Sequence, residues 1–214
     1  MKNFTTFILT LIIGFCHAQN RDPDAQTLLN EMSAKVNEYD NMVLEFKYAL
    51  DNSEENIHQD TRGDICLVGD NYVLNILGIT RIFDGEKLIT ISPEDEEVTI
   101  SKQNTTEENT ITPSQLLTFY EEGYNYKMDI IQNVRGRKIQ YIKLNPIDSN
   151  SEISYVLLGI DTNTKHVYNL IEIGSNGTKT TLTINAFKIN QPLSETLFTF
   201  DAAKYSDYYI NNLD

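Results

Sequence analysis

Short segments in which apolar and polar residues alternate constrain the fold of this chain more than any other feature. In residues 42–50, Leu44, Phe46 and Tyr48 point one way from an extended strand while charged residues point the other. Similar strand segments recur along the chain at 42–50, 61–68, 72–77, 81–83, 87–92, 98–102, 126–134, 138–144, 153–160, 166–173 and 179–189. Most are joined by hairpin-length turns, so we predict a strongly curved antiparallel sheet or a barrel of about eleven strands.

Residues 22–39 change to a three- and four-residue period that predicts an amphipathic helix. Asp22 or Asp24 can cap its first turn, and Pro23 suits a first helical position. The apolar stripe of this helix is Ala25, Leu28, Leu29, Met32, Val36 and Tyr39.

A second helix is predicted inside the run of strands. Thr112, Pro113 and Gln115 form a capping box, and Gly123 ends the segment. Its apolar residues are Leu116, Leu117, Phe119 and Tyr120.

Two further segments carry expectations about local structure. Residues 51–60 are polar and predict a loop. The tail is apolar enough to dock on the rest of the molecule through Phe198, Phe200, Tyr205 and Tyr208.

Residues 1–18 have the pattern of a cleaved secretory signal. Lys2 precedes a short apolar run, and small residues at Cys16 and Ala18 suit a signal peptidase. We expect cleavage after Ala18, export to the periplasm, and a single domain over residues 19–214. The alternatives are a retained anchor helix, or lipidation at Cys16, which the bulky Phe15 before it disfavours.

The composition disfavours several classes of function. A formal net charge of -14 makes the chain a poor ligand for nucleic acid or anionic membrane surfaces, and self-repulsion suits a monomer.

The sequence offers few candidates for a catalytic side chain. His58 and His166 lie in or beside polar turns, which predicts solvated surface side chains. Cys66 lies in an apolar strand and predicts a buried small side chain. No familiar catalytic motif occurs, so we expect no catalytic centre, cofactor or metal site.

Several short segments in a fixed order resemble a known family: 41–46, Gly63 in the following strand, the hairpin at 84–88, Pro93 before 97–100, Thr112-Pro113 with Leu116-Leu117, and 198–201. Their order resembles the periplasmic lipoprotein carrier family, LolA, with this chain as a divergent member. The resemblance implies an unclosed β-barrel with a helical lid. It also implies a carrier that receives acylated lipoproteins from an inner-membrane transporter and passes them to an outer-membrane acceptor.

A carrier of this kind needs an apolar cavity, because each acyl CH₂ taken from a membrane into water costs about 0.8 kcal/mol. The predicted cavity wall is Leu44, Phe46, Tyr48, Ile65, Leu67, Leu74, Ile76 and Leu157. The predicted lid is Leu28, Leu29, Met32, Val36, Leu116, Leu117 and Tyr120. Plain core packing is the competing interpretation for every one of these residues.

This sequence departs from the family at one functional position. Well-studied members carry an arginine near the strand hairpin that holds the lid closed, whereas this chain has Gly69-Asp70-Asn71 there. Arg62 and Arg81 are the nearby arginines, and the role is not transferred to either. The remaining alternatives are a membrane-anchored acceptor or other lipid-binding module of the same fold, an interaction protein with a filled barrel, and an unrecognised enzyme.

Overall fold

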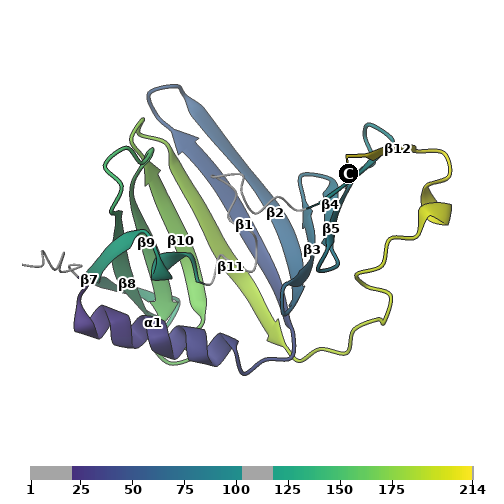
Figure 1. Ribbon diagram of the computed structural model, residues 1–214. Helices are drawn as coiled ribbons and strands as arrows, with labels where there is room; N and C mark the ends of the chain where they lie inside the picture. Colours follow the sequence, from purple (N-terminus) through teal and green to yellow (C-terminus); the bar gives the residue numbers. More distant parts are fainter. Residues whose placement is uncertain (1–20, 103–117, 214) are drawn as a thin grey trace, which may run out of the picture.

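Residues 21–102 and 118–213 are described by the computed structural model, and they form one twelve-stranded sheet with a single α-helix across one side (Figure 1). The strand order is β12-β6-β5-β4-β3-β2-β1-β11-β10-β9-β8-β7. The first eleven strands are β1 (Met42–Asn52), β2 (Ile57–Val68), β3 (Asn71–Ile76), β4 (Ile79–Phe83), β5 (Lys87–Ser92), β6 (Glu97–Lys102), β7 (Tyr124–Val134), β8 (Arg137–Pro146), β9 (Ile153–Asp161), β10 (Val167–Gly174) and β11 (Lys179–Ile189). The predicted curved, unclosed sheet is confirmed, since β7 and β12 lie at its opposite ends.

The twelfth strand was not predicted. β12 (Tyr209–Asn212) pairs parallel with β6 at the end of the sheet, whereas the other neighbouring strands pair antiparallel. It follows a long tail that passes outside the sheet (Figure 1) and includes the short 3₁₀ turn η3 (Ala202–Tyr205). A four-residue strand joined parallel to a distant neighbour carries no hairpin signal, so periodicity could not reveal it.

The predicted loop at 51–60 is wrong, because most of it is strand. β1 continues to Asn52 and β2 begins at Ile57, with these two residues opposite each other. Asn52 is buried and its Oδ1 accepts hydrogen bonds from the amides of Glu54 and Glu55, which orders the turn. The segment beyond Asn52 is polar on both faces, so the alternation that marks a half-buried strand is missing there.

The first predicted helix is confirmed as α1 (Pro23–Val36), three residues shorter than its predicted C-terminal end. Asp22 is the N-cap, and its side chain accepts hydrogen bonds from the amides of Asp24 and Ala25.

The second predicted helix begins in residues that the structure does not describe. After them, the 3₁₀ turn η2 (Phe119–Glu121) leads into β7.

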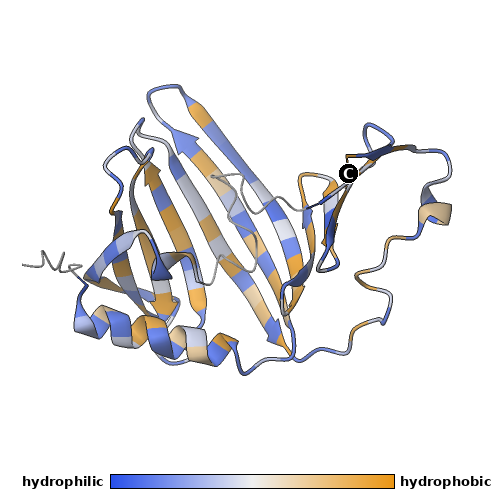
Figure 2. Cartoon of the chain, viewed as in Figure 1, coloured by the Kyte–Doolittle hydropathy of each residue, from blue (hydrophilic) through white to orange (hydrophobic). Residues whose placement is uncertain are grey.

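The two halves of the sheet bury opposite faces. On the concave side, α1 covers β7–β10, and the resulting cluster includes Leu29, Met32, Ile142 and Leu158 (Figures 1 and 2). On the convex side, the tail covers β3–β6 in a second cluster. Its members are Val73, Ile82, Ile89, Ile91, Val98 and Ile100 from the sheet, with Phe198, Phe200, Tyr205 and Tyr208 from the tail. The expectation that the tail docks is therefore confirmed.

Candidate functional site

A third apolar cluster lies on the concave side of the sheet, next to the part that α1 covers. We call it the concave apolar face. It consists of Met42, Leu44, Phe46, Tyr48, Ile65, Leu67, Tyr72, Leu74, Ile76, Phe83, Leu88, Leu182, Ile184, Phe187 and Ile189, with Val36, Tyr39 and Val167 at its border with α1. Seven of the eight residues predicted for a cavity wall are among them.

Strand register explains why these seven side chains share one face. Leu44 lies opposite Ile65, and Ile65 lies opposite Leu74 on the next strand. Their neighbours two residues away along each strand point the same way, since side chains alternate with a period of two. The exposure of these residues is graded. Leu44, Phe46, Ile65 and Leu67 are buried, whereas Tyr48, Leu74 and Ile76 are half-buried.

Gly63 makes room for the ring of Phe46. The two residues are opposite each other in β2 and β1, and a Cβ on Gly63 would come within 2.5 Å of the Phe46 ring and of the Asn75 carbonyl oxygen. Glycine is therefore the residue that lets this aromatic ring lie over β2. In the sequence, Gly63 stands out only as part of the family resemblance.

Leu157 is the predicted wall residue that the structure places elsewhere. Its neighbours Val156 and Leu158 both belong to the cluster under α1, so alternation puts Leu157 on the convex side of β9. The wrong face was inferred because β9 is apolar on both sides, which removes the alternation that assigns faces.

The predicted lid residues of α1 are packed into the core. Leu29 and Met32 are 0% exposed and Leu28 is 7% exposed, while Val36 borders the concave apolar face. Tyr120 of η2 packs in the same cluster, and burial raises its pKa to about 12. Leu116 and Leu117 lie outside the described residues.

Polar contacts also fasten α1 to the sheet near its first turn. The second carboxylate oxygen of Asp22 accepts a hydrogen bond from the Met128 amide, 3.1 Å away. This bond and those from the amides of the first helical turn hold the pKa of Asp22 below its usual range. The Tyr126 hydroxyl donates to the Gln26 side chain.

The other end of α1 is fastened to the turn between β9 and β10. Lys165 forms an ion pair with Glu31 at 2.5 Å, and the Tyr39 hydroxyl hydrogen-bonds His166 at 2.8 Å. The His166 ring also stacks on Phe187, with ring centroids 3.9 Å apart. His166 is therefore half-buried and not the solvated histidine that the sequence predicted, because α1 packs onto its turn.

Burial lowers the pKa of His166, and the nearby Lys35 adds to this effect. One acid also lies on the concave side. Glu172 is on the same face of β10 as the buried Leu170, opposite Val156, and burial raises its pKa.

The described residues offer no metal site or membrane-spanning helix. Over residues 21–102 and 118–213, no group of three or more His, Cys, Asp or Glu side chains could hold a metal ion. Nor is any helix in those ranges long and apolar enough to cross a bilayer. Cys66 is buried as expected, and burial raises the pKa of its thiol.

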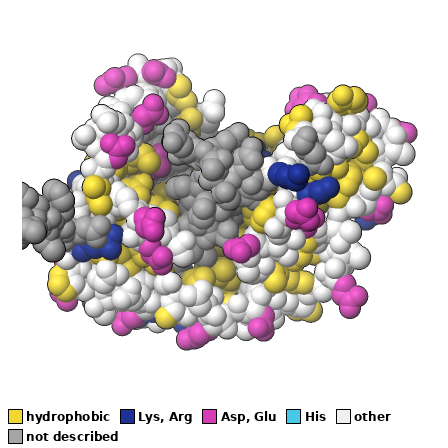
Figure 3. Space-filling model, in the orientation of Figure 1, with side chains coloured by type: hydrophobic (Ala, Val, Ile, Leu, Met, Phe, Trp, Pro, Cys, Tyr) yellow, Lys and Arg dark blue, Asp and Glu magenta, His cyan; other side chains and the backbone are white. Residues whose placement is uncertain are grey.

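Hydrophobic and charged side chains are distributed unevenly over the surface. In the view of Figure 3, hydrophobic side chains form patches on both halves of the molecule, and acidic side chains lie around them.

These features define a class of fold that can bind apolar ligands. The sheet is strongly curved and open, a helix lies across its concave side, and an apolar face lies beside that helix.

Comparisons with known proteins identify the family. The model of the family described as outer membrane lipoprotein carrier protein LolA matches residues 79–201, more than half of the chain. This chain belongs to that family. A search of curated proteins found no match.

Solved structures agree on the fold. An uncharacterized conserved protein from Thermus thermophilus is 9% identical, with a TM-score of 0.57 over 88% of this chain and 99% of that one. LprF from Mycobacterium bovis is 10% identical, with a TM-score of 0.50 over 82% and 97% of the two chains. At such low identity, these similarities show the fold alone.

Proposed function

We propose that this protein binds the acyl chains of lipoproteins on its concave apolar face and carries them between membranes. The observation that supports the proposal is the gathering of β1–β5 and β11 side chains into one continuous apolar surface, part of it half-exposed, beside a helix. Membership in the lipoprotein carrier family agrees with this role and with binding rather than covalent chemistry.

The concave apolar face has the chemistry that an acyl chain requires. The free energy of transferring an acyl chain from a membrane to a protein is near zero only if the protein offers a comparably apolar surface. Each CH₂ of the acyl chain contributes about 0.8 kcal/mol to that transfer. The half-buried Tyr48, Leu74 and Ile76 provide such a surface without first breaking up the core under α1. We therefore assign cargo contact to the concave apolar face, and a fixed structural role to Leu28, Leu29 and Met32.

The predicted export signal and the family support a route for the cargo. We propose that residues 1–18 are cleaved and that the protein works in the periplasm as a monomer. An inner-membrane lipoprotein-releasing transporter delivers the cargo, and an outer-membrane acceptor receives it. No cofactor, metal ion or nucleic acid takes part.

A matched pair of substitutions tests the binding face. Leu74→Asn places a polar side chain on the concave apolar face, and Leu157→Asn makes the same change at a half-buried position on the convex side. We expect Leu74→Asn to weaken binding of a fluorescent palmitoyl ligand about tenfold, as for the loss of one buried leucine contact. Leu157→Asn should leave the affinity within twofold. Equal effects of the two substitutions, or no palmitoyl binding by the unmodified protein, would count against the carrier function.

A further inference from the structure

β2 has an open edge where it extends past β3. β2 pairs with β3 only from Gly63 to Val68, whereas it pairs with β1 from Ile57 to Leu67. Residues 57–62 therefore have no strand partner on the β3 side among the described residues. We call these six residues the open edge; at about 3.3 Å per residue they span about 20 Å. Backbone groups along such an edge can pair with an added strand.

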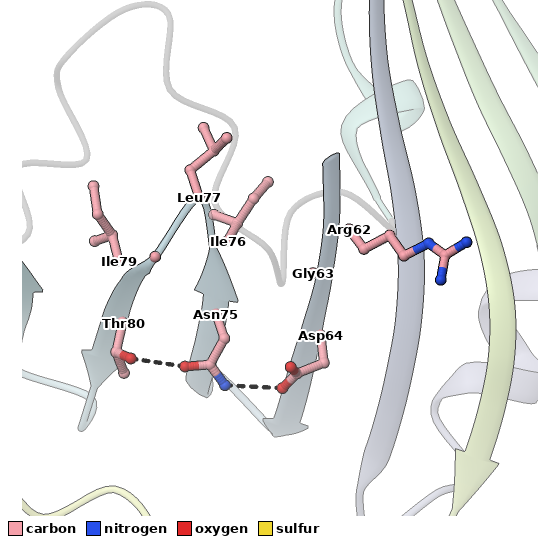
Figure 4. Close-up of a pocket in the computed structure, with 9 residues that line it drawn as sticks. Arg62, Gly63, Asp64, Asn75, Ile76, Leu77, Ile79 and Thr80 are labelled. Carbon is pink, nitrogen blue, oxygen red and sulfur yellow. Dashed lines mark hydrogen bonds between the residues drawn. The ribbon is translucent and has the colours of Figure 1, made fainter. Parts of the chain in front are cut away.

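The turn between β3 and β4 lies at the base of the open edge. An open pocket of about 310 Å³ between them is lined by Arg62, Gly63 and Asp64 of β2 and by residues 75–80 of the hairpin. Figure 4 shows Leu77 at the end of this hairpin with Ile76 and Ile79 beside it, while the Arg62 side chain points away from them. Leu77 is 71% exposed, so a strand added to the open edge would meet an apolar surface at its end.

Leu77 is an unfavourable residue for the turn that it occupies. Its φ is 55° and that of Gly78 is 76°, so both central residues of the turn have positive φ. Asn or Gly is preferred at the first of these positions, because a branched side chain is strained there. One exposed leucine needs no explanation by itself. An exposed leucine at a strained position, beside an edge without a strand partner in the described part of the chain, is placed to contact a ligand.

The charges around the open edge favour a basic ligand. Asp60 pairs with Lys47 at 2.8 Å, and Asp51 pairs with His58. Arg62, the cation at one end of the open edge, points its side chain away from the β3–β4 hairpin (Figure 4). At the other end, Glu54 and Glu55 are exposed in the β1–β2 turn and have no cationic partner among the described residues. An added strand would therefore lie close to the unpaired carboxylates of Glu54 and Glu55, which favour a ligand with positive charge.

We propose that the open edge and Leu77 bind, as an added β-strand, the extended basic peptide segment next to the acylated residue of the cargo. This inference rests on the proposed carrier function. It names the peptide as a second recognised part of the cargo, beside the acyl chain. The two parts are contiguous in the structure, because Ile76 belongs to the concave apolar face and Leu77 follows it at the rim. An acyl chain on that face would place its attached peptide at the start of the open edge.

Synthetic ligands can test the two parts separately. The probes are palmitic acid, a palmitoylated lysine-containing peptide, the same peptide with glutamate in place of lysine, and the basic peptide without palmitate. The variants are Leu77→Asn, the pair Glu54→Lys with Glu55→Lys, and Ile130→Asn as the control. Ile130 is 53% exposed on β7, at the far end of the sheet.

We expect the palmitoylated basic peptide to bind about tenfold more tightly than palmitic acid and to slow hydrogen exchange at residues 57–62. Leu77→Asn should remove most of that gain and leave palmitic acid binding unchanged, while raising the thermal midpoint because Asn relieves the strained turn. The double lysine variant should prefer the acidic peptide. Ile130→Asn should behave as the unmodified protein.

Three results would overturn this proposal. If palmitic acid binds but the peptide adds no affinity and no protection, the peptide site fails while the carrier function stands. If no acylated probe binds, both fail. Protection of residues 57–62 that appears without peptide and grows with protein concentration would assign the open edge to a second copy of this chain.

Discussion

At the scale of single residues, the concave apolar face is built from side chains that each strand presents at every second position. Strict alternation in β1 assigned Leu44, Phe46 and Tyr48 to one face, and the structure brings them together. Leu157 was misassigned because its strand is apolar on both sides, which leaves no polar face to set the register. His166 was misread because a polar turn in sequence becomes half-buried once a distant helix packs on it.

Gly63 provides a prediction at this scale. Gly63→Ala should lower the free energy of unfolding by about 1–3 kcal/mol, because its Cβ would overlap the Phe46 ring and the Asn75 carbonyl oxygen. Gly63→Ala should cost less free energy of unfolding in a Phe46→Leu background than in the unmodified protein, since the leucine can move aside. Urea unfolding of the four proteins measures the coupling. Strict additivity would mean that Gly63 is not needed to accommodate the ring.

At the scale of elements, strand pairing determines the secondary structure even where the local sequence favours a loop. Residues 51–60 are polar on both faces, yet β1 and β2 hold each other in register up to their connecting turn. The helix α1 shows the opposite case, in which cap, proline and apolar stripe agreed and the prediction held. Its buried stripe and its contacts with the sheet hold α1 against β7–β10, beside the concave apolar face.

The C-terminal contact of α1 should depend on pH. The folded protein lowers the pKa of His166, so protonation favours the unfolded state. The stabilisation is complete above the unfolded pKa of about 6.5 and is lost as the pH falls through the lowered folded value. The groups that face His166 are Tyr39, Phe187, Lys35 and Asp161.

We therefore expect the stability advantage of the unmodified protein over His166→Gln to shrink between pH 7.5 and pH 5. Urea unfolding across this range measures it, together with hydrogen exchange in the last turn of α1. His58→Gln is the control, because His58 is 76% exposed and pairs with Asp51 across the β1–β2 hairpin, away from α1. A constant difference between the unmodified protein and His166→Gln would show that the histidine does not titrate on unfolding in this range.

At the scale of the whole molecule, the sequence predicted a curved antiparallel sheet but not how both of its faces are covered. Hairpin signals reveal only neighbours in sequence, and they gave the order of most strands. The tail crosses the convex side with only the short η3 turn as regular structure among the described residues. It then adds β12 beside β6, a contact between segments more than a hundred residues apart. Loop-like segments that cover a sheet have no periodic signal, so only their apolar residues suggested docking.

The covering of the convex side leads to the last prediction. Phe198 and Phe200 pack with Tyr205 against Ile82, Ile89 and Val98, so replacing both phenylalanines with serine should expose that part of the sheet. Each lost aromatic contact at these half-buried positions should lower the free energy of unfolding by about 1–3 kcal/mol. The fluorescence of an added apolar dye should rise, because the dye binds the exposed apolar surface. Tyr209→Ser, at a 69% exposed residue of β12, is the matched control and should change neither quantity appreciably. Palmitoyl binding should survive in the folded fraction of the double variant, because the tail and the concave apolar face lie on opposite sides of the sheet. Loss of palmitoyl binding in protein that remains folded would mean that the two sides are coupled.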